Sequence, residues 1–218
     1  MTDFALARSK MIVSQVRPNG ITDGRIIQAM ASLPREMFVP ESRRCLAYMD
    51  EDIDIGSGRS LMEPMALAKL VQLAEIESGE HVLHVGCASG YATALLAALA
   101  KTVVAVDENT GFVETASANL ARLGIANAAI HKGPLAAGWS NGQPYDAIVI
   151  DGRVPGVPSA LFEQLRDGGR LVAVVGDNDV ATATAYNRHD GAISSRPAFE
   201  ASVGRLPGFI VERPAFVF

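Results

Sequence analysis

The stretch His81-Val-Leu-His-Val-Gly-Cys-Ala-Ser-Gly-Tyr91 decides the fold of this chain. The apolar residues up to Val85 predict a buried strand, and the small residues 86–90 predict a tight turn that leads into a helix. A second apolar run ends at Asp107, about twenty residues after the turn. Such a turn lets backbone N–H groups approach a ligand, and a carboxylate at the tip of the next strand can accept both hydroxyls of a ribose. The stretch therefore predicts a site for an adenosine-containing cofactor.

The length, composition and net charge of the chain exclude several classes of protein. The chain has 218 residues, of which 49% are hydrophobic, so one domain with a packed core is expected. The net charge of −5 argues against a general affinity for nucleic acid or for anionic membranes. Only two cysteines occur, Cys45 and Cys87, without metal-ligand spacing. We expect no metal site and a soluble protein of the cytoplasm with reduced thiols, because the sequence shows neither a secretory signal nor a bilayer-spanning run.

Short β-branched runs alternate with helical stretches after residue 80. The predicted strands cover residues 82–85, 103–106, 128–131, 147–150 and 170–175, and the predicted helices cover 91–100, 110–123 and 158–165. Apolar strands that alternate with helices indicate a parallel sheet covered on both faces. Residues 181–188 and 192–203, joined by Asp190-Gly191, predict a hairpin that closes one edge of the sheet with an antiparallel strand.

The flanking segments have a different pattern. The first eighty residues are predicted to be helical with a loop at 48–63, and Thr22 or Asp23 can cap a helix that ends before Pro34. The apolar residues 209–218 are expected to pack on the body of the molecule or on a second subunit of a homodimer. We therefore divide the domain into a helical N-terminal extension with a loop (1–78), a cofactor-binding α/β core (79–176), and a C-terminal hairpin and tail (177–218).

Three interpretations of the turn stay open at this point: a nicotinamide dinucleotide, S-adenosylmethionine, or an inherited fold that binds nothing. A dinucleotide site needs a third glycine where the helix packs beneath the pyrophosphate, and Tyr91 stands there instead. S-adenosylmethionine has no phosphate, and Ser89 with the turn amides could meet its carboxylate or ribose. The motif alone favours S-adenosylmethionine.

An ordered series of motifs resembles the protein-L-isoaspartate O-methyltransferase family from about Gly20 to Gly176. The matching segments are Gly20-Ile-Thr-Asp-Gly-Arg-Ile-Ile-Gln-Ala-Met30, Phe38-Val-Pro40, Ile55-Gly-Ser-Gly58, the turn 86–91, Pro144-Tyr-Asp-Ala-Ile-Val-Ile150 and Gly168-Gly-Arg-Leu-Val172. The resemblance implies the Rossmann-like α/β fold of class I S-adenosylmethionine-dependent methyltransferases, with a mostly parallel seven-stranded sheet, an antiparallel edge strand and a helical N-terminal extension. It also implies S-adenosylmethionine as cofactor and the isoaspartyl carboxylate of a damaged protein or peptide as methyl acceptor.

The resemblance also implies which residues form the site. The family serine that is thought to hold the substrate carboxylate falls on Met62, and Ser60 is the hydroxyl nearest to it in sequence. These two are the candidate catalytic residues. The candidate cofactor contacts are Gly86, Cys87, Ala88, Ser89, Gly90, Asp107, Glu108, Gly133, Pro134, Leu135 and Asp151.

Several positions depart from the family pattern. The middle glycine of the turn is Ala88, which is tolerable at negative φ and strained at positive φ. The acidic residue of the first strand is His84, which we expect to be an ordinary histidine with satisfied hydrogen bonds. The glycine–aspartate pair implied to contact the adenine is Gly133-Pro134, so a carboxylate and a backbone N–H are both missing. We expect these changes to weaken the cofactor site without abolishing it.

Some acidic residues allow two interpretations. Asp107 either meets the ribose or caps the helix that begins near Thr110. Asp151 either touches a ligand at the end of its strand or pairs with Arg153. The run containing Asp50, Glu51, Asp52 and Asp54 is expected to be a solvated face, because no histidine or cysteine joins it at ligand spacing.

The first functional hypothesis is S-adenosylmethionine-dependent methylation of isoaspartyl carboxylates in protein repair. A carboxylate is already ionised at neutral pH, so the lack of an obvious catalytic histidine or cysteine does not count against it. The alternative is a catalytically degenerate relative that binds S-adenosylmethionine weakly or not at all and acts through protein contacts. Methylation of a nucleic-acid base is disfavoured because Asp151-Gly-Arg-Val-Pro155 provides no aromatic clamp after the fourth strand, and a nicotinamide oxidoreductase is a remote fourth hypothesis.

Overall fold

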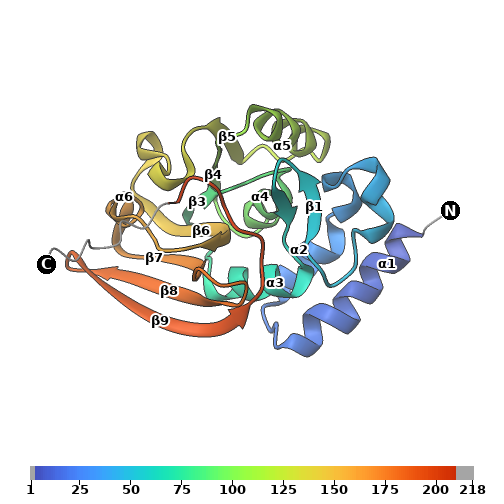
Figure 1. Cartoon of the computed structure of the whole chain (residues 1–218), viewed down its shortest axis with the longest axis horizontal. Coiled ribbons are helices and arrows are strands. Elements are labelled where there is room, and N and C mark those ends of the chain that lie inside the picture. The colour runs from blue at the N-terminus through green and yellow to red at the C-terminus, as the bar shows by residue number, and fades with distance from the viewer. Residues whose placement is uncertain (1–2, 210–218) are drawn as a thin grey trace, which may run out of the picture.

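The computed structural model describes residues 3–209, and a seven-stranded sheet runs through them. The strand order is β5-β4-β3-β6-β7-β8-β9. The strands are β3 (His81–Val85), β4 (Thr102–Asp107), β5 (Ala128–Lys132), β6 (Tyr145–Val154), β7 (Leu165–Val175), β8 (Ala181–His189) and β9 (Ala192–Ala201). Strands β3 to β7 pair in parallel, as the apolar runs predict (Figure 1). The order reverses at β3, so the carboxyl ends of β3, β4 and β6 border the crevice where open α/β sheets bind ligands.

Helices follow three of these strands. They are α4 (Tyr91–Ala97), α5 (Thr110–Arg122) and α6 (Ser159–Glu163), and short 3₁₀ turns cover Leu135–Ala137 and Ser140–Gly142. Each helix lies inside its predicted segment, although α4 and α6 end earlier than predicted. Helix α5 begins where the Asn109 side chain accepts hydrogen bonds from the N–H groups of Gly111 (2.9 Å) and Phe112 (3.3 Å).

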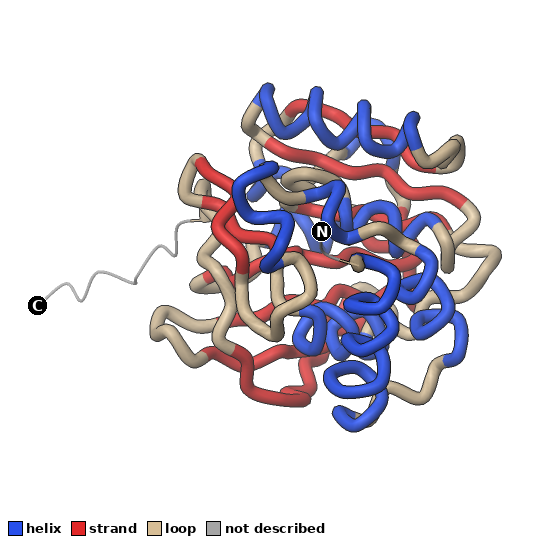
Figure 2. The backbone as a smooth tube through the Cα atoms, turned by 90° about the vertical axis from the view of Figure 1, so that its right-hand side faces the viewer, coloured by secondary structure: helices blue, strands red, loops and turns tan. Residues whose placement is uncertain are grey.

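A helical extension precedes the sheet, and its part before residue 47 lies at one side of the sheet, at the right of Figure 1 and toward the viewer in Figure 2. It contains α1 (Phe4–Met11), a π-helical turn (Ile12–Val16), α2 (Gly24–Ser32), α3 (Pro64–Leu73) and 3₁₀ turns at Arg17–Asn19, Arg35–Phe38 and Glu41–Leu46. Asp23 caps α2 by accepting a hydrogen bond from the N–H of Arg25 at 2.8 Å, which confirms the predicted start of this helix. The extension reaches the core through Phe38, whose ring meets that of Tyr91 edge-on, 5.3 Å between centroids.

The segment 48–63, which the sequence predicts as a loop, contains a β-hairpin. Strands β1 (Ile53–Gly56) and β2 (Arg59–Leu61) pair antiparallel, and alternate residues of each are buried. The prediction is wrong because strands of three and four residues carry too short a pattern, and the glycines between them dominate it. The alternation places Arg59 on the same buried face as Leu61.

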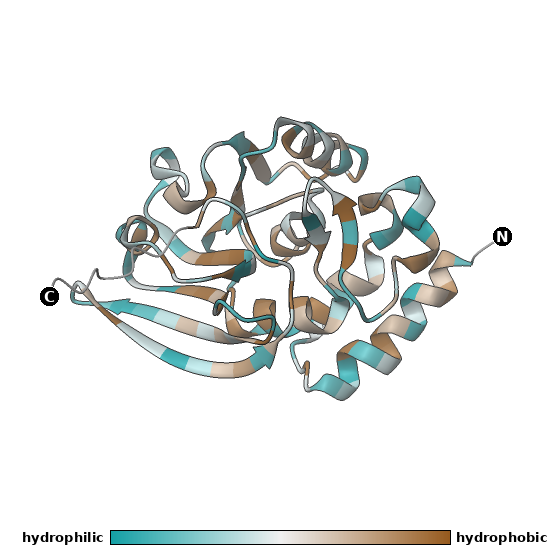
Figure 3. Ribbon diagram, viewed as in Figure 1, coloured by the Kyte–Doolittle hydropathy of each residue, from teal (hydrophilic) through white to brown (hydrophobic). Residues whose placement is uncertain are grey.

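The predicted C-terminal hairpin is confirmed. Strand β8 runs antiparallel to β7 and to β9, and the turn residues Asp190 and Gly191 both have positive φ (49° and 77°) as a tight hairpin turn requires. Strand β9 is mostly exposed, and hydrophilic residues recur along the hairpin (Figure 3). Polar residues on an outer strand discourage pairing with other chains.

Two predictions concern the rest of the molecule. No helix within residues 3–209 combines the length and the apolar character that crossing a bilayer would take. Phe209, the first residue of the predicted apolar tail, is buried. The remainder of that tail, and with it the predicted homodimer contact, lies outside the described residues.

Candidate functional site

The turn that follows β3 forms a tight backbone cradle. Gly86, Ala88 and Gly90 have φ values of 87°, 44° and 95°, all in the left-handed region. The N–H groups of Gly86 and Cys87 donate to the carbonyl of Val106 in β4, at 2.9 and 3.3 Å. These bonds tie the turn to the neighbouring strand. Ala88 therefore has the positive φ that strains a residue with a Cβ.

Asp107 ends β4 beside this turn and is completely buried. Its Oδ2 accepts a hydrogen bond from the N–H of Ala88 at 2.9 Å, and its Oδ1 accepts one from the N–H of Asn109 at 3.1 Å. The interpretation of Asp107 as the cap of α5 is wrong, because the Asn109 side chain caps that helix. The carboxylate lies against the turn, where the ribose prediction needs it, and the contact with ribose itself stays a prediction.

A guanidinium from β2 occupies the same place. Nη1 of Arg59 lies 3.0 Å from Oδ2 of Asp107, and Nη2 donates to the carbonyl of Gly86 at 2.8 Å. The Arg59 side chain is only 4% exposed. Arg59 therefore satisfies a carboxylate charge that would otherwise be buried without a cationic partner.

Leu206 fills the remaining space over the turn. A Cβ built on Gly86 would lie 3.0 Å from Cδ2 of Leu206 and 3.2 Å from Nη2 of Arg59. The adjoining cavity is lined by Asp52, Arg59, Ser60, Met62, Asp151, Gly152 and residues 203–206. Its volume of about 10 Å³ is close to that of a single water molecule, whereas ligand sites typically measure about 300–1,000 Å³. The turn and the acid are present, but this cavity is too small for a nucleoside cofactor.

A buried polar chain lies below the cradle. His84 is completely buried, with Nδ1 2.8 Å from Oγ1 of Thr93 and Nε2 3.5 Å from Oδ2 of Asp151. The predicted structural role is confirmed for Nδ1, but the expectation of satisfied hydrogen bonds is wrong for Nε2, which is buried near Asp151 and has no hydrogen-bond partner among the described residues. The predicted pairing of Asp151 with Arg153 is wrong, because Arg153 instead donates to backbone carbonyls of residues 177 and 178. Asp151 lines the small cavity, and its contact with a ligand stays a prediction.

The two candidate catalytic residues line the same cavity. The Met62 side chain is buried, and its carbonyl accepts a hydrogen bond from Nη2 of the fully buried Arg35 at 2.6 Å. Burial lowers the pKa of Arg35, and nearby charges including that of Asp151 oppose this shift. Ser60 is half-buried, and its Oγ would lie 3.3 Å from a Cβ built on Gly204. Met62 offers no hydroxyl at the place where the family serine is expected.

The predicted adenine contacts lie beside the end of β4. The N–H of Gly133 donates to the carbonyl of Asp107 at 3.0 Å, and the neighbouring Pro134 is exposed. Glu108 is also exposed, whereas Leu135 is buried in the apolar core under the sheet. Gly133, Pro134 and Glu108 are therefore placed where a ligand on Asp107 could reach them, and the Leu135 side chain is not.

The acidic run is not the uniform solvated face that the sequence predicts. Asp52 is half-buried, and its carboxylate accepts hydrogen bonds from the N–H groups of Glu63 (2.8 Å) and Gly204 (2.7 Å). Burial raises the pKa of Asp52. Burial, together with the charges of Asp50 and Asp52, raises the pKa of Glu63 to about 7. Asp52 thus ties the hairpin to the start of α3 and to the segment that carries Leu206.

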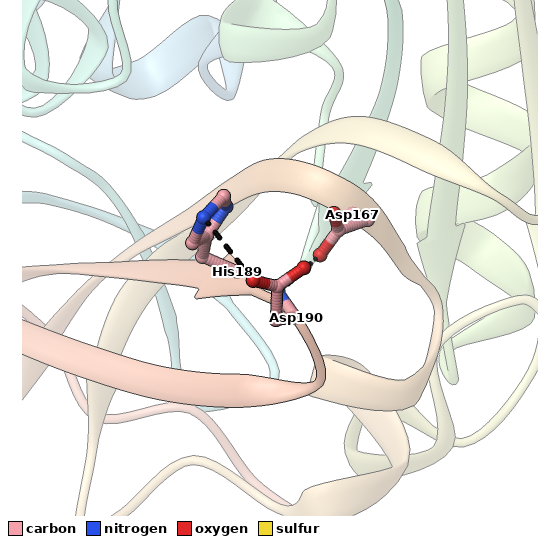
Figure 4. A group of neighbouring side chains, drawn as sticks. All are labelled: Asp167, His189 and Asp190. Carbon is pink, nitrogen blue, oxygen red and sulfur yellow. Dashed lines mark hydrogen bonds and ion pairs between the residues drawn. The ribbon is translucent and has the colours of Figure 1, made fainter.

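One group of metal-ligand side chains gathers among the described residues, at the opposite edge of the sheet. Asp167, His189 and Asp190 are exposed, and their ligand atoms lie within 4.8 Å of one another (Figure 4). The N–H of Asp190 donates to Oδ1 of Asp167 at 2.7 Å, and Nε2 of His189 lies 3.5 Å from Oδ2 of Asp190. These contacts hold the β8–β9 turn against the start of β7, which gives the group a structural explanation.

Sequence reasoning missed the two residues that close the cradle. Arg59 lies two residues before Leu61, so two-residue alternation alone would have placed it on the buried face with Leu61. A buried arginine needs an acid, and Asp107 was already a candidate. Leu206 has no comparable signal, because its backbone pairs with Arg153, which is distant in sequence.

Sequence comparisons with known proteins lead to the same family over most of the chain. The family described as Protein-L-isoaspartate(D-aspartate) O-methyltransferase matches residues 7–202. A protein-L-isoaspartate O-methyltransferase 1 of Rhodopseudomonas palustris is 39% identical, over 83% of this chain and 74% of the relative. A protein-L-isoaspartate O-methyltransferase of Methanoculleus marisnigri is 37% identical, over 87% of this chain and 86% of the relative.

Solved structures show the same architecture. A protein-L-isoaspartate O-methyltransferase structure superposes with a TM-score of 0.82 at 25% identity, over 92% of this chain and 66% of that one. A Plasmodium falciparum structure of the same description, in complex with S-adenosyl-L-homocysteine, superposes with a TM-score of 0.76 at 18% identity. That superposition covers 95% of this chain and 100% of the other.

Proposed function

The chain belongs to the protein-L-isoaspartate(D-aspartate) O-methyltransferase family, and from this membership we propose that it transfers a methyl group from S-adenosylmethionine to the isoaspartyl carboxylate of damaged proteins. The observation that carries the proposal is the extent of the likeness. The family match reaches from residue 7 to residue 202 and so includes every strand of the sheet. We place the reaction in the cytoplasm, because both cysteines are free thiols.

The proposed acceptor needs little acid–base chemistry. A carboxyl group with a pKa of about 4 is already ionised at neutral pH, so its methylation needs no general base. The contribution of the protein is to align the acceptor and exclude water. This requirement is consistent with a site whose histidine, His84, is completely buried between Thr93 and Asp151.

Ser60 and Met62 are the residues that we propose to border the acceptor carboxylate. Ser60 supplies a hydroxyl that can donate a hydrogen bond, and Met62 supplies only apolar contact. Asp52 and Asp151 line the same cavity and would repel a carboxylate. The guanidinium of the fully buried Arg35 offsets this repulsion, because its charge attracts both Asp52 and Asp151.

The proposal is tested by methyl transfer from isotope-labelled S-adenosylmethionine to a peptide that contains one isoaspartyl residue. The matched control is the same peptide with an ordinary aspartyl residue. We expect labelled methyl ester on the isoaspartyl peptide and none on the control. Absence of labelled ester from both peptides, at cofactor concentrations that saturate binding, would remove the proposed activity.

A further inference from the structure

Arg59 is a cation whose contacts the proposed transfer does not explain. Its guanidinium contacts Asp107 and the carbonyl of Gly86, and its Cζ lies 5.8 Å from the centroid of the Phe112 ring. The Arg59 side chain is 4% exposed and that of Asp107 is not exposed at all. Two opposite charges buried this deeply depend on each other, because either one alone would lack a counter-charge.

The partners of Arg59 are the groups that a bound nucleoside would need. A ribose held by Asp107 donates its hydroxyls to the same carboxylate, and a ligand seated on the turn lies against the backbone of Gly86. Nη2 of Arg59 lies only 3.2 Å from the place of a Cβ on Gly86. One small volume cannot hold both the guanidinium and a ligand, so the two compete for the cradle.

Of the two side chains over the turn, that of Arg59 is the one that can move away by rotation about its own bonds, provided that a ligand takes over its contact with Asp107. Leu206 is fixed by its backbone: its N–H donates to the carbonyl of Arg153 at 2.8 Å, and the N–H of Arg153 donates to the carbonyl of Gly204 at 2.8 Å. The backbone of Arg59 is paired with Gly56 in the hairpin, but its guanidinium is held over the turn by side-chain contacts, so rotation of the side chain alone can withdraw it. Next to it, a groove of about 410 Å³ runs between residues 57–58 and residues 205–209.

We propose that Arg59 is a built-in occupant of the cofactor cradle, which a nucleoside cofactor displaces from Asp107 in order to bind. The free protein is then closed by its own side chain, and Arg59 sets the affinity for the cofactor. The identity of the ligand rests on the proposed function. The competition itself rests on the geometry of Arg59, Asp107 and Gly86.

The test is calorimetric titration of the full chain with S-adenosylhomocysteine. Arg59→Gln keeps a polar side chain and removes the ion pair with Asp107. Arg43→Gln is the matched control, because Arg43 forms an exposed ion pair with Asp54 of the same hairpin, 3.2 Å between charged atoms. We expect Arg59→Gln to bind at least about tenfold more tightly than wild type and Arg43→Gln to bind as wild type does. Binding by folded Arg59→Gln that is equal to or weaker than that of wild type would overturn the proposal.

A second measurement uses only the wild-type protein, in case the substitution prevents folding. An arginine-selective dicarbonyl reagent, read out by peptide mass spectrometry, reports how accessible Arg59 is. We expect slow modification of Arg59 in the free protein and faster modification when S-adenosylhomocysteine saturates it. An unchanged rate, or no saturable binding by the wild type and by folded Arg59→Gln alike, would contradict displacement.

Neither readout depends on turnover, so the inference and the proposed function can fail separately. Tighter binding by Arg59→Gln, without methyl transfer to the isoaspartyl peptide by either protein, supports the inference and removes the proposed activity. Methyl transfer by a wild type whose affinity Arg59→Gln leaves unchanged supports the activity and removes the inference.

Discussion

Ala88 is strained where a glycine would be relaxed. Its φ is 44°, and the left-handed region costs a residue with a Cβ about 1–2 kcal/mol. Ala88→Gly removes this strain but also increases the freedom of the unfolded chain, so we expect a net gain of about 0.5–1 kcal/mol in the free energy of unfolding, measured with urea. The control is Ala92→Gly within α4, which should lose about 1 kcal/mol. Destabilisation by both substitutions would mean that the turn carries no strain.

Pro134 offers a separate test of the predicted adenine position. It is exposed, with φ −62° and ψ 130°, a conformation that aspartate adopts freely. The resemblance implies that an acid here contacts the adenine, so Pro134→Asp should bind S-adenosylhomocysteine about tenfold more tightly in a calorimetric titration. Pro134→Ala restores the N–H without the carboxylate and should gain less. Equal affinity for wild type and Pro134→Asp would place the adenine elsewhere.

At this scale the sequence could predict the acid of the site but not its partner. Asp107 ends a long apolar run beside a glycine-rich turn, and that local pattern is enough to place its carboxylate. Arg59 lies 48 residues away, on a hairpin too short to be recognised, so their contact depends on tertiary packing. The sequence could predict only that Ala88 would be strained if its φ were positive. It could not predict the sign of φ, because the identity of the side chain does not set it.

Among the elements, α3 begins directly after Glu63, which lies close to several other acidic residues. This arrangement makes the stability of the protein depend on pH. Burial, then the charges of Asp50 and Asp52, raises the pKa of Glu63 from 4.5 to about 7. The pKa of Glu63 is higher in the folded protein than in the unfolded chain, so protonation of Glu63 stabilises the fold. This stabilisation is complete below about pH 4.5 and is lost as pH rises through about 7. The glutamine of Glu63→Gln does not titrate. The free energy of unfolding of this variant, relative to that of wild type, should therefore rise by on the order of 1 kcal/mol between pH 5 and pH 8, after allowance for solvent screening.

Urea unfolding of both proteins at the two pH values measures this difference. Glu51→Gln serves as the control, since Glu51 is an exposed acid of the same run, and it should follow the wild-type pH dependence. A gap between wild type and Glu63→Gln that is the same at both pH values would contradict the raised pKa.

Elements with strong local patterns were predictable, and those without them were not. The alternation of apolar strands and helices over residues 81–175 has a period that a single sequence reveals, and Asp190-Gly191 marks its hairpin unambiguously. The β1–β2 hairpin lacks such a signal, because its strands have four and three residues. Yet this hairpin brings Arg59 to the cradle, so the weakest local pattern has the largest effect on the site.

At the scale of the whole molecule, the cradle and the side chains that cover it come from three segments that are far apart in the chain. The turn after β3 forms its floor, the β1–β2 hairpin contributes Arg59, and residues 203–206 contribute Leu206. Asp52 links the last two segments, since it accepts a hydrogen bond from the N–H of Gly204 at 2.7 Å. The N-terminal extension and the C-terminal segment are therefore connected to each other and to the sheet. We expect them to unfold together with the sheet in one transition.

The chain offers a direct test of that cooperativity. Phe38 of the extension is buried and packs on Tyr91 of the core, 5.3 Å between centroids. Trp139, the only tryptophan, stacks on His131 at 4.3 Å and reports on the core. Phe38→Ala should lower the free energy of unfolding by about 3 kcal/mol, and urea transitions followed by tryptophan fluorescence and by far-ultraviolet circular dichroism should shift together. A shift in circular dichroism that leaves the fluorescence transition in place would show that residues 1–78 unfold separately from the sheet.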